Sequence, residues 1–222
     1  MGEKNLARNK YPEETVNLIL ETATRLFISK GYEHASIQDI INNLGGLSKG
    51  AIYHHFKSKE EILVAVINRM SEESNKLLSN IKNRTDMTGK EKLKKLMTDS
   101  INRSVHDKIF AAAPNLGDSP ALVFSILKGT IDYTTPEYVL PIIKQGIEDG
   151  SIQTEYPVEL AELIMLVGNI WLNPMIFDDS PEDIYKKCIV YDKMLRAFGL
   201  DIIDESIFER FRSLAGLYQQ NK

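Results

Sequence analysis

The chain has 222 residues, which is long enough to bury a full hydrophobic core. Hydrophobic residues make up 43% and charged residues 26% of it, proportions that are typical of soluble globular proteins and exclude a largely disordered chain. The formal net charge of -4 is unevenly placed, because residues 1–60 hold eight Lys and Arg against seven Asp and Glu, and the remainder holds 19 against 24. Contact with phosphate needs only a local basic patch, so the acidic total does not exclude a nucleic-acid partner.

No apolar run approaches the roughly 18 to 20 residues that a membrane span needs, and the first residues lack the apolar stretch of a signal peptide. We therefore expect a cytoplasmic protein with no membrane partner. Cys188 is the only cysteine, which excludes a disulfide within the chain and the metal motifs that use paired thiolates. We expect neither a cofactor nor a metal site, and we expect Cys188 to be a buried structural thiol.

The first predicted helix covers residues 13–30, where apolar side chains recur with the three- and four-residue spacing of one helix face. Gly31 suits the C-terminal end of this helix. A short second helix begins at Ser36, whose hydroxyl can cap it while the carboxylate of Asp39 reaches back to the cap.

Two glycines, Gly45 and Gly46, separate the second helix from a third helix that Ser48 can cap. In the third helix Ile52 and Phe56 point to the same side, which predicts that both are buried. The opposite face then presents small and hydrogen-bonding side chains, namely Gly50, Ala51, Tyr53 and His54. Two short helices joined by a tight turn and braced by a longer first helix predict a helix-turn-helix module.

A long fourth helix is expected over residues 58–84, with Ser58 and Glu61 as its capping box. Six more helices are predicted in the rest of the chain. They are expected over residues 90–112, from Ser119-Pro120, from Thr135-Pro136 to Gly150, over 157–174, over 180–199 and over 204–218. The sequence has no alternating strand pattern and no internal repeat, so it predicts an all-α protein of about ten helices.

Two segments of the chain carry a family resemblance. Residues 36–41 (SIQDII) and 47–63 (LSKGAIYHHFKSKEEIL) resemble the DNA-binding signature of TetR-type repressors. The resemblance is strong over residues 13–70 and generic beyond them, where it rests chiefly on residues 145–150 (QGIEDG). The turn at residues 44–47 is one residue longer than the Ala-Gly-Val form that is common in the family.

The resemblance implies a helix-turn-helix DNA-binding domain of three helices over residues 13–73 and a helical ligand-binding and dimerisation domain over residues 74–222. It further implies a DNA-binding transcriptional regulator rather than an enzyme, and specifically a repressor that a small hydrophobic ligand releases from a palindromic operator. A helical enzyme and a ligand-independent DNA-binding protein are the alternatives. The sequence contains no HExxH, GxSxG, P-loop or GxGxxG segment that would support an enzyme.

The implied partner of the N-terminal domain is double-stranded operator DNA. In TetR-type proteins the residues matching Tyr53 and Lys59 hold phosphates, and those matching residues 48–53 face the major groove. The candidate DNA-binding residues are Ser36, Ser48, Lys49, Gly50, Ala51, Tyr53, His54, Lys57 and Lys59. Neighbouring side chains on a helix diverge by about 100°, so the adjacent His54 and His55 are not expected to share a metal ion.

The resemblance also implies a pocket among the C-terminal helices for an unknown small-molecule effector. The candidate ligand-binding residues are Asn102, His106, Phe110, Phe124, Tyr133 and Trp171. Residues 157–174 carry two apolar stripes, and residues 180–199 repeat the helical spacing. One stripe can serve the core and another a partner, so we expect a homodimer through these two helices, the eighth and ninth of the prediction. Burial of both helices within one chain is the alternative.

Overall fold

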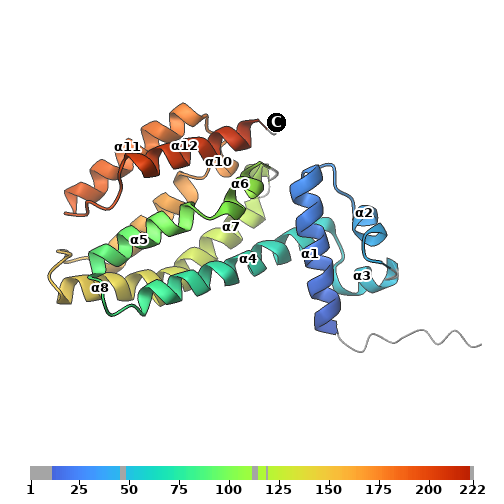
Figure 1. Ribbon diagram of the computed structural model, residues 1–222, viewed down its shortest axis with the longest axis horizontal. Helices are drawn as coiled ribbons and strands as arrows, with labels where there is room; N and C mark the ends of the chain where they lie inside the picture. The colour runs from blue at the N-terminus through green and yellow to red at the C-terminus, as the bar shows by residue number, and fades with distance from the viewer. Residues whose placement is uncertain (1–11, 46–48, 112–114, 119, 221–222) are drawn as a thin grey trace, which may run out of the picture. The chain divides into compact units, whose positions relative to one another are not determined.

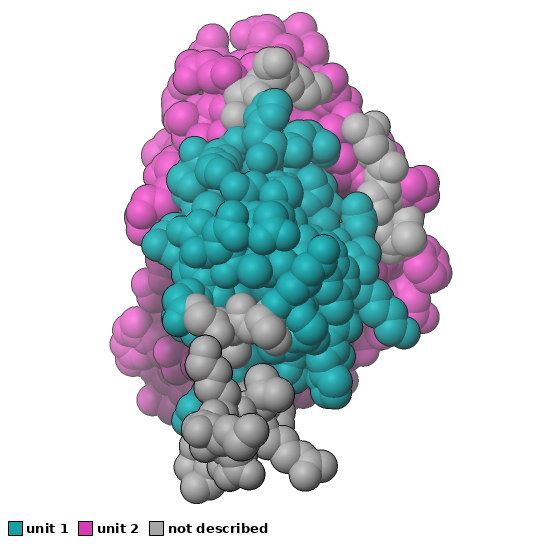
Figure 2. Space-filling view, turned by 90° about the vertical axis from the view of Figure 1, so that its right-hand side faces the viewer, with its two compact units in different colours: residues 1–70 teal, residues 71–222 magenta. Residues whose placement is uncertain are grey.

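The computed structural model describes residues 12–45, 49–111, 115–118 and 120–220 (Figure 1). Every regular element in these ranges is a helix, which confirms the all-α prediction, and none is long and apolar enough to cross a membrane. The chain divides into two compact units, residues 1–70 and 71–222, which Figure 2 colours separately. Each unit has its own hydrophobic core.

The first unit contains the predicted helix-turn-helix elements. They are α1 (Pro12–Lys30), α2 (Ile37–Asn42), α3 (Lys49–His55) and the N-terminal part of α4 (Lys59–Lys82). Their apolar faces meet in one core, in which Ile19, Ile40 and Ile52 are fully buried. Gly31 ends α1 with a φ of +79°, a conformation that glycine adopts without strain.

Side-chain caps fix the starts of α2 and α4. The Ser36 hydroxyl accepts the Asp39 N–H (3.0 Å), and the Asp39 carboxylate accepts the Ser36 N–H (2.9 Å), which completes the predicted capping box. At α4 the Ser58 hydroxyl accepts the Glu61 N–H (3.1 Å), as predicted. The Glu61 carboxylate, however, accepts the N–H of Lys57 (2.7 Å), so this cap reaches one residue further back than a standard capping box.

The second unit is a helical bundle with two π-helical segments. Its elements after α4 are α5 (Gly89–Ile101), α6 (Ser104–Phe110), the 3-10 turn η1 (Leu116–Asp118), α7 (Pro120–Gly129), the π-helix η2 (Thr130–Val139), α8 (Leu140–Glu148), α9 (Pro157–Leu166), the π-helix η3 (Val167–Trp171), α10 (Pro174–Phe177), α11 (Pro181–Ala197) and α12 (Glu205–Gln219). α11 and α12 lie side by side (Figure 1), α5 packs on α8, and α9 packs on η2. Cys188 of α11 is buried as predicted, and burial raises the pKa of its thiol to about 12, which keeps the thiol protonated.

The helix predicted over residues 90–112 is two helices, because the chain bends after Ile101. Asn102 ends α5, and Arg103 has an extended backbone (φ -64°, ψ 127°) that cannot continue a helix. The Ile101 carbonyl, freed by this break, accepts the Nε–H of Arg210 from α12 (3.0 Å). The compensating partner is distant in the sequence, so local periodicity could not predict the break. Residue 112 lies outside the described residues.

The helix start predicted at Thr135-Pro136 is also wrong, because residues 120–148 are helical without interruption through α7, η2 and α8. Proline lacks an N–H, and its ring crowds the carbonyl four residues earlier in an α-helix. The wider turn of the π-helix, with bonds spanning five residues, removes this conflict. The Thr135 hydroxyl donates to the Thr130 carbonyl (2.8 Å) and adds a side-chain bond over the same five-residue span.

The two apolar stripes predicted on residues 157–174 are both buried within the chain. Their buried members are Leu160, Ala161, Ile164, Met165, Val167, Leu172 and Met175. The expectation that one of these stripes faces a partner is therefore wrong, and the alternative of burial within one chain holds for them. The next two helices begin at side-chain caps, since Ser180 caps α11 and Asp204 caps α12.

A buried lysine joins the end of α4 to the start of α5 and the end of α8. Lys92 is only 2% exposed, and its ammonium donates to the Lys82 carbonyl (2.8 Å) and to Oε1 of Gln145 (2.5 Å). Nε2 of Gln145 in turn donates to the Met87 carbonyl (2.9 Å). Gln145 is the first residue of the QGIEDG segment, so this segment has a structural role in holding three helices together.

Two glycines allow α5 and α8 to lie in backbone contact. A Cβ atom added to Gly89 would lie 2.3 Å from the backbone nitrogen of Gly146. The Gly89 N–H donates to the carboxylate of Asp149 (2.8 Å), which therefore holds the start of α5 in this position. Because backbone surrounds Gly89, a side chain there requires the two helices to separate.

We predict that Gly89→Ala lowers the free energy of unfolding of the second unit by about 3 kcal/mol, because overpacking against backbone cannot relax through a rotamer change. Gly129→Ala is the matched control, since Gly129 is helical and a Cβ there meets nothing within 4 Å. Alanine at that position is expected to be neutral or slightly stabilising. Urea unfolding followed through Trp171, the only tryptophan, measures both variants. Equal stability of the two variants would contradict the prediction.

Candidate nucleic-acid interface and effector site

The third helix presents the face that the sequence predicted. Ile52 is fully buried and Phe56 is at the edge of burial, whereas Gly50, Tyr53 and His54 are exposed and Ala51 is partly exposed. Lys49 is also exposed, with its ammonium 5.7 Å from the centre of the Tyr53 ring. Small residues beside hydrogen-bonding ones on an exposed helix suit close entry into a DNA groove. Ser48, the remaining candidate on this turn, lies outside the described residues.

The polar candidates around α3 differ in whether their side chains already make hydrogen bonds within the first unit. Lys57 is exposed, and only its backbone N–H has a described bond, to Glu61. Ser36 is exposed, but its hydroxyl both accepts from the backbone and donates to the carboxylate of Asp39 in the cap of α2. Lys30 pairs with the same carboxylate (2.7 Å), and this ammonium together with Ser36 holds the pKa of Asp39 well below its usual range.

Lys59 has a structural contact that the sequence did not reveal. Its ammonium donates to the Tyr32 carbonyl (3.0 Å) and lies 4.1 Å from the centre of the Tyr32 ring. The Tyr32 hydroxyl donates to Glu60 (3.4 Å), and burial and this carboxylate raise the pKa of Tyr32 to about 12. Lys59 therefore fixes the loop after α1 to the start of α4. An ammonium has three N–H donors, so a phosphate can still be bound by the others.

The two adjacent histidines of α3 have their rings 5.1 Å apart in an edge-on arrangement, with His54 exposed and His55 partly buried. Within the part of the chain that the structure describes, no three His, Cys, Asp or Glu side chains are grouped to hold a metal ion.

Of the six effector candidates, His106 and Phe110 are in ring contact with each other, and the other four lie on other elements of the second unit. His106 and Phe110 lie on one face of α6, with ring centres 6.3 Å apart. Burial and the charge of Arg103 lower the pKa of His106, which favours the neutral imidazole. Asn102 is exposed at the end of α5.

The three remaining candidates, all aromatic, lie on other elements. Phe124 on α7 is 60% exposed, and Tyr133 on η2 is 52% exposed with its ring beside that of Tyr138 (6.1 Å). Trp171 is partly buried at the end of η3, where the ammonium of Lys187 contacts it. Trp171 is thus a candidate whose ring is already in contact with a charged side chain.

Two arginines beside His106, Arg103 and Arg210, were not among the residues predicted from the sequence. Nη1 of Arg103 donates to the Ser74 hydroxyl on α4 (2.6 Å), and Nη1 of Arg210 on α12 pairs with Asp107 on α6 (2.6 Å). These bonds connect the joint between α5 and α6 to two other helices of the second unit. The two arginines are far apart in the sequence and follow no motif, so no local signal could have identified them.

Comparison with known proteins gives two matching family models. The model for bacterial regulatory proteins of the tetR family matches residues 19–66, which contain α2 and α3. The model for a tetracyclin repressor-like C-terminal domain matches residues 97–194. Together these two segments make up more than half of the chain.

Individual relatives agree with these models. The HTH-type transcriptional regulator YuxN of Bacillus subtilis is 39% identical over 74 residues, which are 33% of this chain and 25% of YuxN, so the chain spans a quarter of that relative's length. The crystal structure of a transcriptional regulator from Cytophaga hutchinsonii has a TM-score of 0.59 at 17% identity and covers 94% of this chain and 98% of its own. A TetR-family regulator from Pectobacterium atrosepticum has a TM-score of 0.59 at 21% identity, over 84% of this chain and 95% of its own. The two structures show that the fold is shared.

We predict that Lys59→Met lowers the free energy of unfolding of the first unit by about 2 kcal/mol, the usual contribution of a hydrogen bond from a charged donor. Methionine keeps much of the apolar stem and removes only the ammonium that binds the Tyr32 carbonyl. Lys57→Met is the control, because the Lys57 side chain is exposed and is expected to change stability by less than about 0.5 kcal/mol. Thermal unfolding followed by circular dichroism compares them, and an unchanged Lys59→Met would rule out the structural contact.

Proposed function

Because the chain belongs to the TetR family of bacterial regulatory proteins, we propose that it is a homodimeric repressor that binds a palindromic operator and is released from it by a small-molecule effector. The observation that carries the proposal is the exposed face of α3. It combines small residues at its start with Tyr53 and His54, and the exposed lysines Lys49 and Lys57 flank it. Such a face can enter a major groove while Lys57 binds a phosphate beside it.

In this proposal the DNA-binding domain covers residues 13–73, and residues 74–222 bind the effector and form the dimer. Residues 48–54, apart from the buried Ile52, face the major groove. The phosphate contacts come from Tyr53 and Lys59, together with Ser36 and Lys57. Lys59 then has two roles, because its ammonium binds the Tyr32 carbonyl through one N–H and can bind a phosphate through another. The effector site uses residues from the set Asn102, His106, Phe110, Phe124, Tyr133 and Trp171.

The proposed dimer still uses α9 with η3 and α11, but through their outer faces. Val158 at the start of α9, Val190 in α11 and Phe198 after α11 are exposed apolar residues of this region. Two such faces on one protomer suit the four-helix contact of a two-fold dimer. In such a dimer the two α3 helices can enter successive major grooves, which lie about 34 to 36 Å apart on B-DNA.

The operator experiment is selection of binding sites from random double-stranded DNA with the full-length protein. We expect the selected sites to be inverted repeats, because a two-fold dimer binds two equivalent half-sites. Analytical ultracentrifugation of the complex checks that one site holds two chains. Selection of sites without two-fold symmetry, or no selection above the starting pool, would contradict the proposed operator binding.

We further predict that Lys57→Ala weakens binding to all DNA sequences about equally, because a phosphate contact carries no base information. The slope of log K against log[salt] is expected to become less steep by about one unit, because one phosphate contact is lost. His54→Ala is expected instead to change the preferred bases at one position of each half-site. Fluorescence anisotropy at several salt concentrations measures both variants, with Lys144→Ala, an exposed residue of α8, as a control expected to match the wild type. An unchanged salt slope in Lys57→Ala would show that Lys57 does not contact a phosphate.

A further inference from the structure

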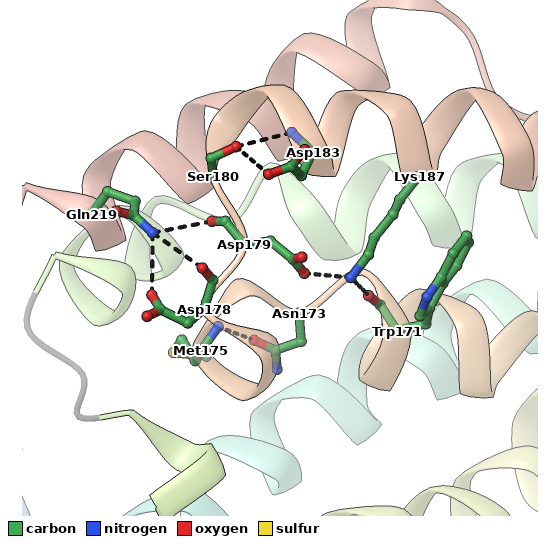
Figure 3. A network of polar contacts seen from close by, with 9 residues as sticks. All are labelled: Trp171, Asn173, Met175, Asp178, Asp179, Ser180, Asp183, Lys187 and Gln219. Carbon is green, nitrogen blue, oxygen red and sulfur yellow. Dashed lines mark hydrogen bonds and ion pairs between the residues drawn. The ribbon is translucent and has the colours of Figure 1, made fainter.

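The ammonium of Lys187 is enclosed by an aromatic and carboxylate cage in the second unit. It pairs with the carboxylate of Asp179 and donates to the Trp171 carbonyl (3.1 Å), as Figure 3 shows. It also lies 4.8 Å from the centre of the Phe177 ring and 5.5 Å from that of the Trp171 ring. The side chains of Lys187 and Asp179 are only 18% and 15% exposed. The cage thus offers negative charge, a carbonyl acceptor and two ring faces to one cation.

The framework of the cage is held by bonds that do not involve Lys187. Nε2 of Gln219 on α12 donates to Oδ1 of Asp178 (3.2 Å) and to the carbonyl of Asp179 (3.3 Å), so it fixes the segment that carries the carboxylate (Figure 3). The Ser180 hydroxyl then caps α11 by accepting the Asp183 N–H (3.2 Å). Removal of the lysine head group therefore leaves in place the bonds that hold the backbone carrying the Asp179 carboxylate.

A second set of bonds fixes the aromatic side of the cage. Oδ1 of Asn173 accepts the Met175 N–H (3.0 Å) and caps α10, the short helix that ends at Phe177. Phe177 is 52% exposed although its ring lies against the ammonium. The cage consequently has a rigid wall and an edge that is open to solvent at Phe177.

We propose that Trp171, Phe177 and Asp179 form a binding site for a primary-ammonium ligand with an apolar body, and that Lys187 occupies this site when no ligand is present. The carboxylate neutralises the ligand's charge, the Trp171 carbonyl accepts one N–H, and the rings contact the adjoining carbon chain. The claim that this ligand belongs to the class of the effector rests on the proposed function. The claim that the site binds such a ligand is tested without DNA.

The ligand has to compete with the chain's own lysine. A tethered cation has a high effective concentration at its site, so a free ammonium binds more weakly to the wild type than to a chain without the tether. Displaced Lys187 no longer joins α11 to the end of η3 and to the segment after α10, which gives a ligand at this site a route to alter the packing of the second unit.

The test is titration of Lys187→Ala with n-propylammonium chloride, which supplies the three carbons and the nitrogen that the substitution deletes. Trp171 is the only tryptophan of the chain and belongs to the cage, so its emission reports occupancy. We expect a saturable change, with a dissociation constant at least tenfold lower than that of the wild type. Sodium chloride keeps the ionic strength constant, and n-propanol is the neutral analogue that should produce no saturable change.

Three variants complete the design. Lys186→Ala removes the neighbouring lysine, whose side chain is 64% exposed, and is expected to respond as the wild type does. Asp179→Asn, combined with Lys187→Ala, is expected to weaken propylammonium binding at least tenfold. Lys187→Met fills the cage with an apolar stem and is expected not to respond.

The proposal is overturned if folded Lys187→Ala shows no saturable change, if n-propanol produces the same change, or if Asp179→Asn has no effect on the titration. Circular dichroism establishes that the variant is folded. If it is not, titration of the wild type at tenfold higher concentrations decides the matter, because the same site must then respond and Asp179→Asn alone must weaken that response. No DNA is present, so failure of the operator experiments and failure of this one are read separately.

Discussion

The second unit depends on the buried ammonium of Lys92. A charge removed from water is tolerated only where its hydrogen bonds are replaced, and Lys92 binds the carbonyl of Lys82, the last residue of α4, and the side-chain oxygen of Gln145 on α8. This bond orients the Gln145 amide, whose NH₂ group then binds the Met87 carbonyl just before α5. One cation thereby fixes where α4 ends, where α5 begins and how α8 lies beside them. The close approach of Gly89 to Gly146 follows from this arrangement.

The same physical solution recurs at two other joints of the second unit. Lys187 binds the carbonyl of the last residue of η3, and Arg210 binds that of the last residue of α5. A helix C-terminus carries partial negative charge and unpaired carbonyls, so a cation from another helix satisfies both groups at once. The joints between helices are therefore held by electrostatic contacts, whereas the helix faces pack through apolar side chains. A cation that competes for such a joint acts on how the helices are joined, which is consistent with the proposed ligand site around Lys187.

In the first unit, the residues that hold the module together and those left for a partner lie next to each other on the same short elements. Ser36 and Asp39 complete the start of α2, and Lys59 fastens Tyr32 to the start of α4. Tyr53 on α3 is exposed, and within the described residues no hydrogen bond ties its side chain to another helix. A rigid frame around an exposed face lowers the entropy that binding has to overcome, which supports the proposed recognition of DNA by α3.

The sequence by itself determined the helical class, the bounds of α1, α11 and α12 and the face of α3, because apolar periodicity and caps act between residues three or four apart. It also revealed the family signature at residues 36–63. Only the tertiary structure decided the break after Ile101, since the arginine that satisfies the freed carbonyl comes from α12. The same holds for Lys59, whose partner Tyr32 lies in the loop after α1, and for the burial of both stripes at residues 157–174, which pack against other helices. Trp171 likewise acquires its site only when η3, α10 and α11 pack together, because this packing brings the Phe177 ring, the Asp179 carboxylate and the Lys187 ammonium to one place.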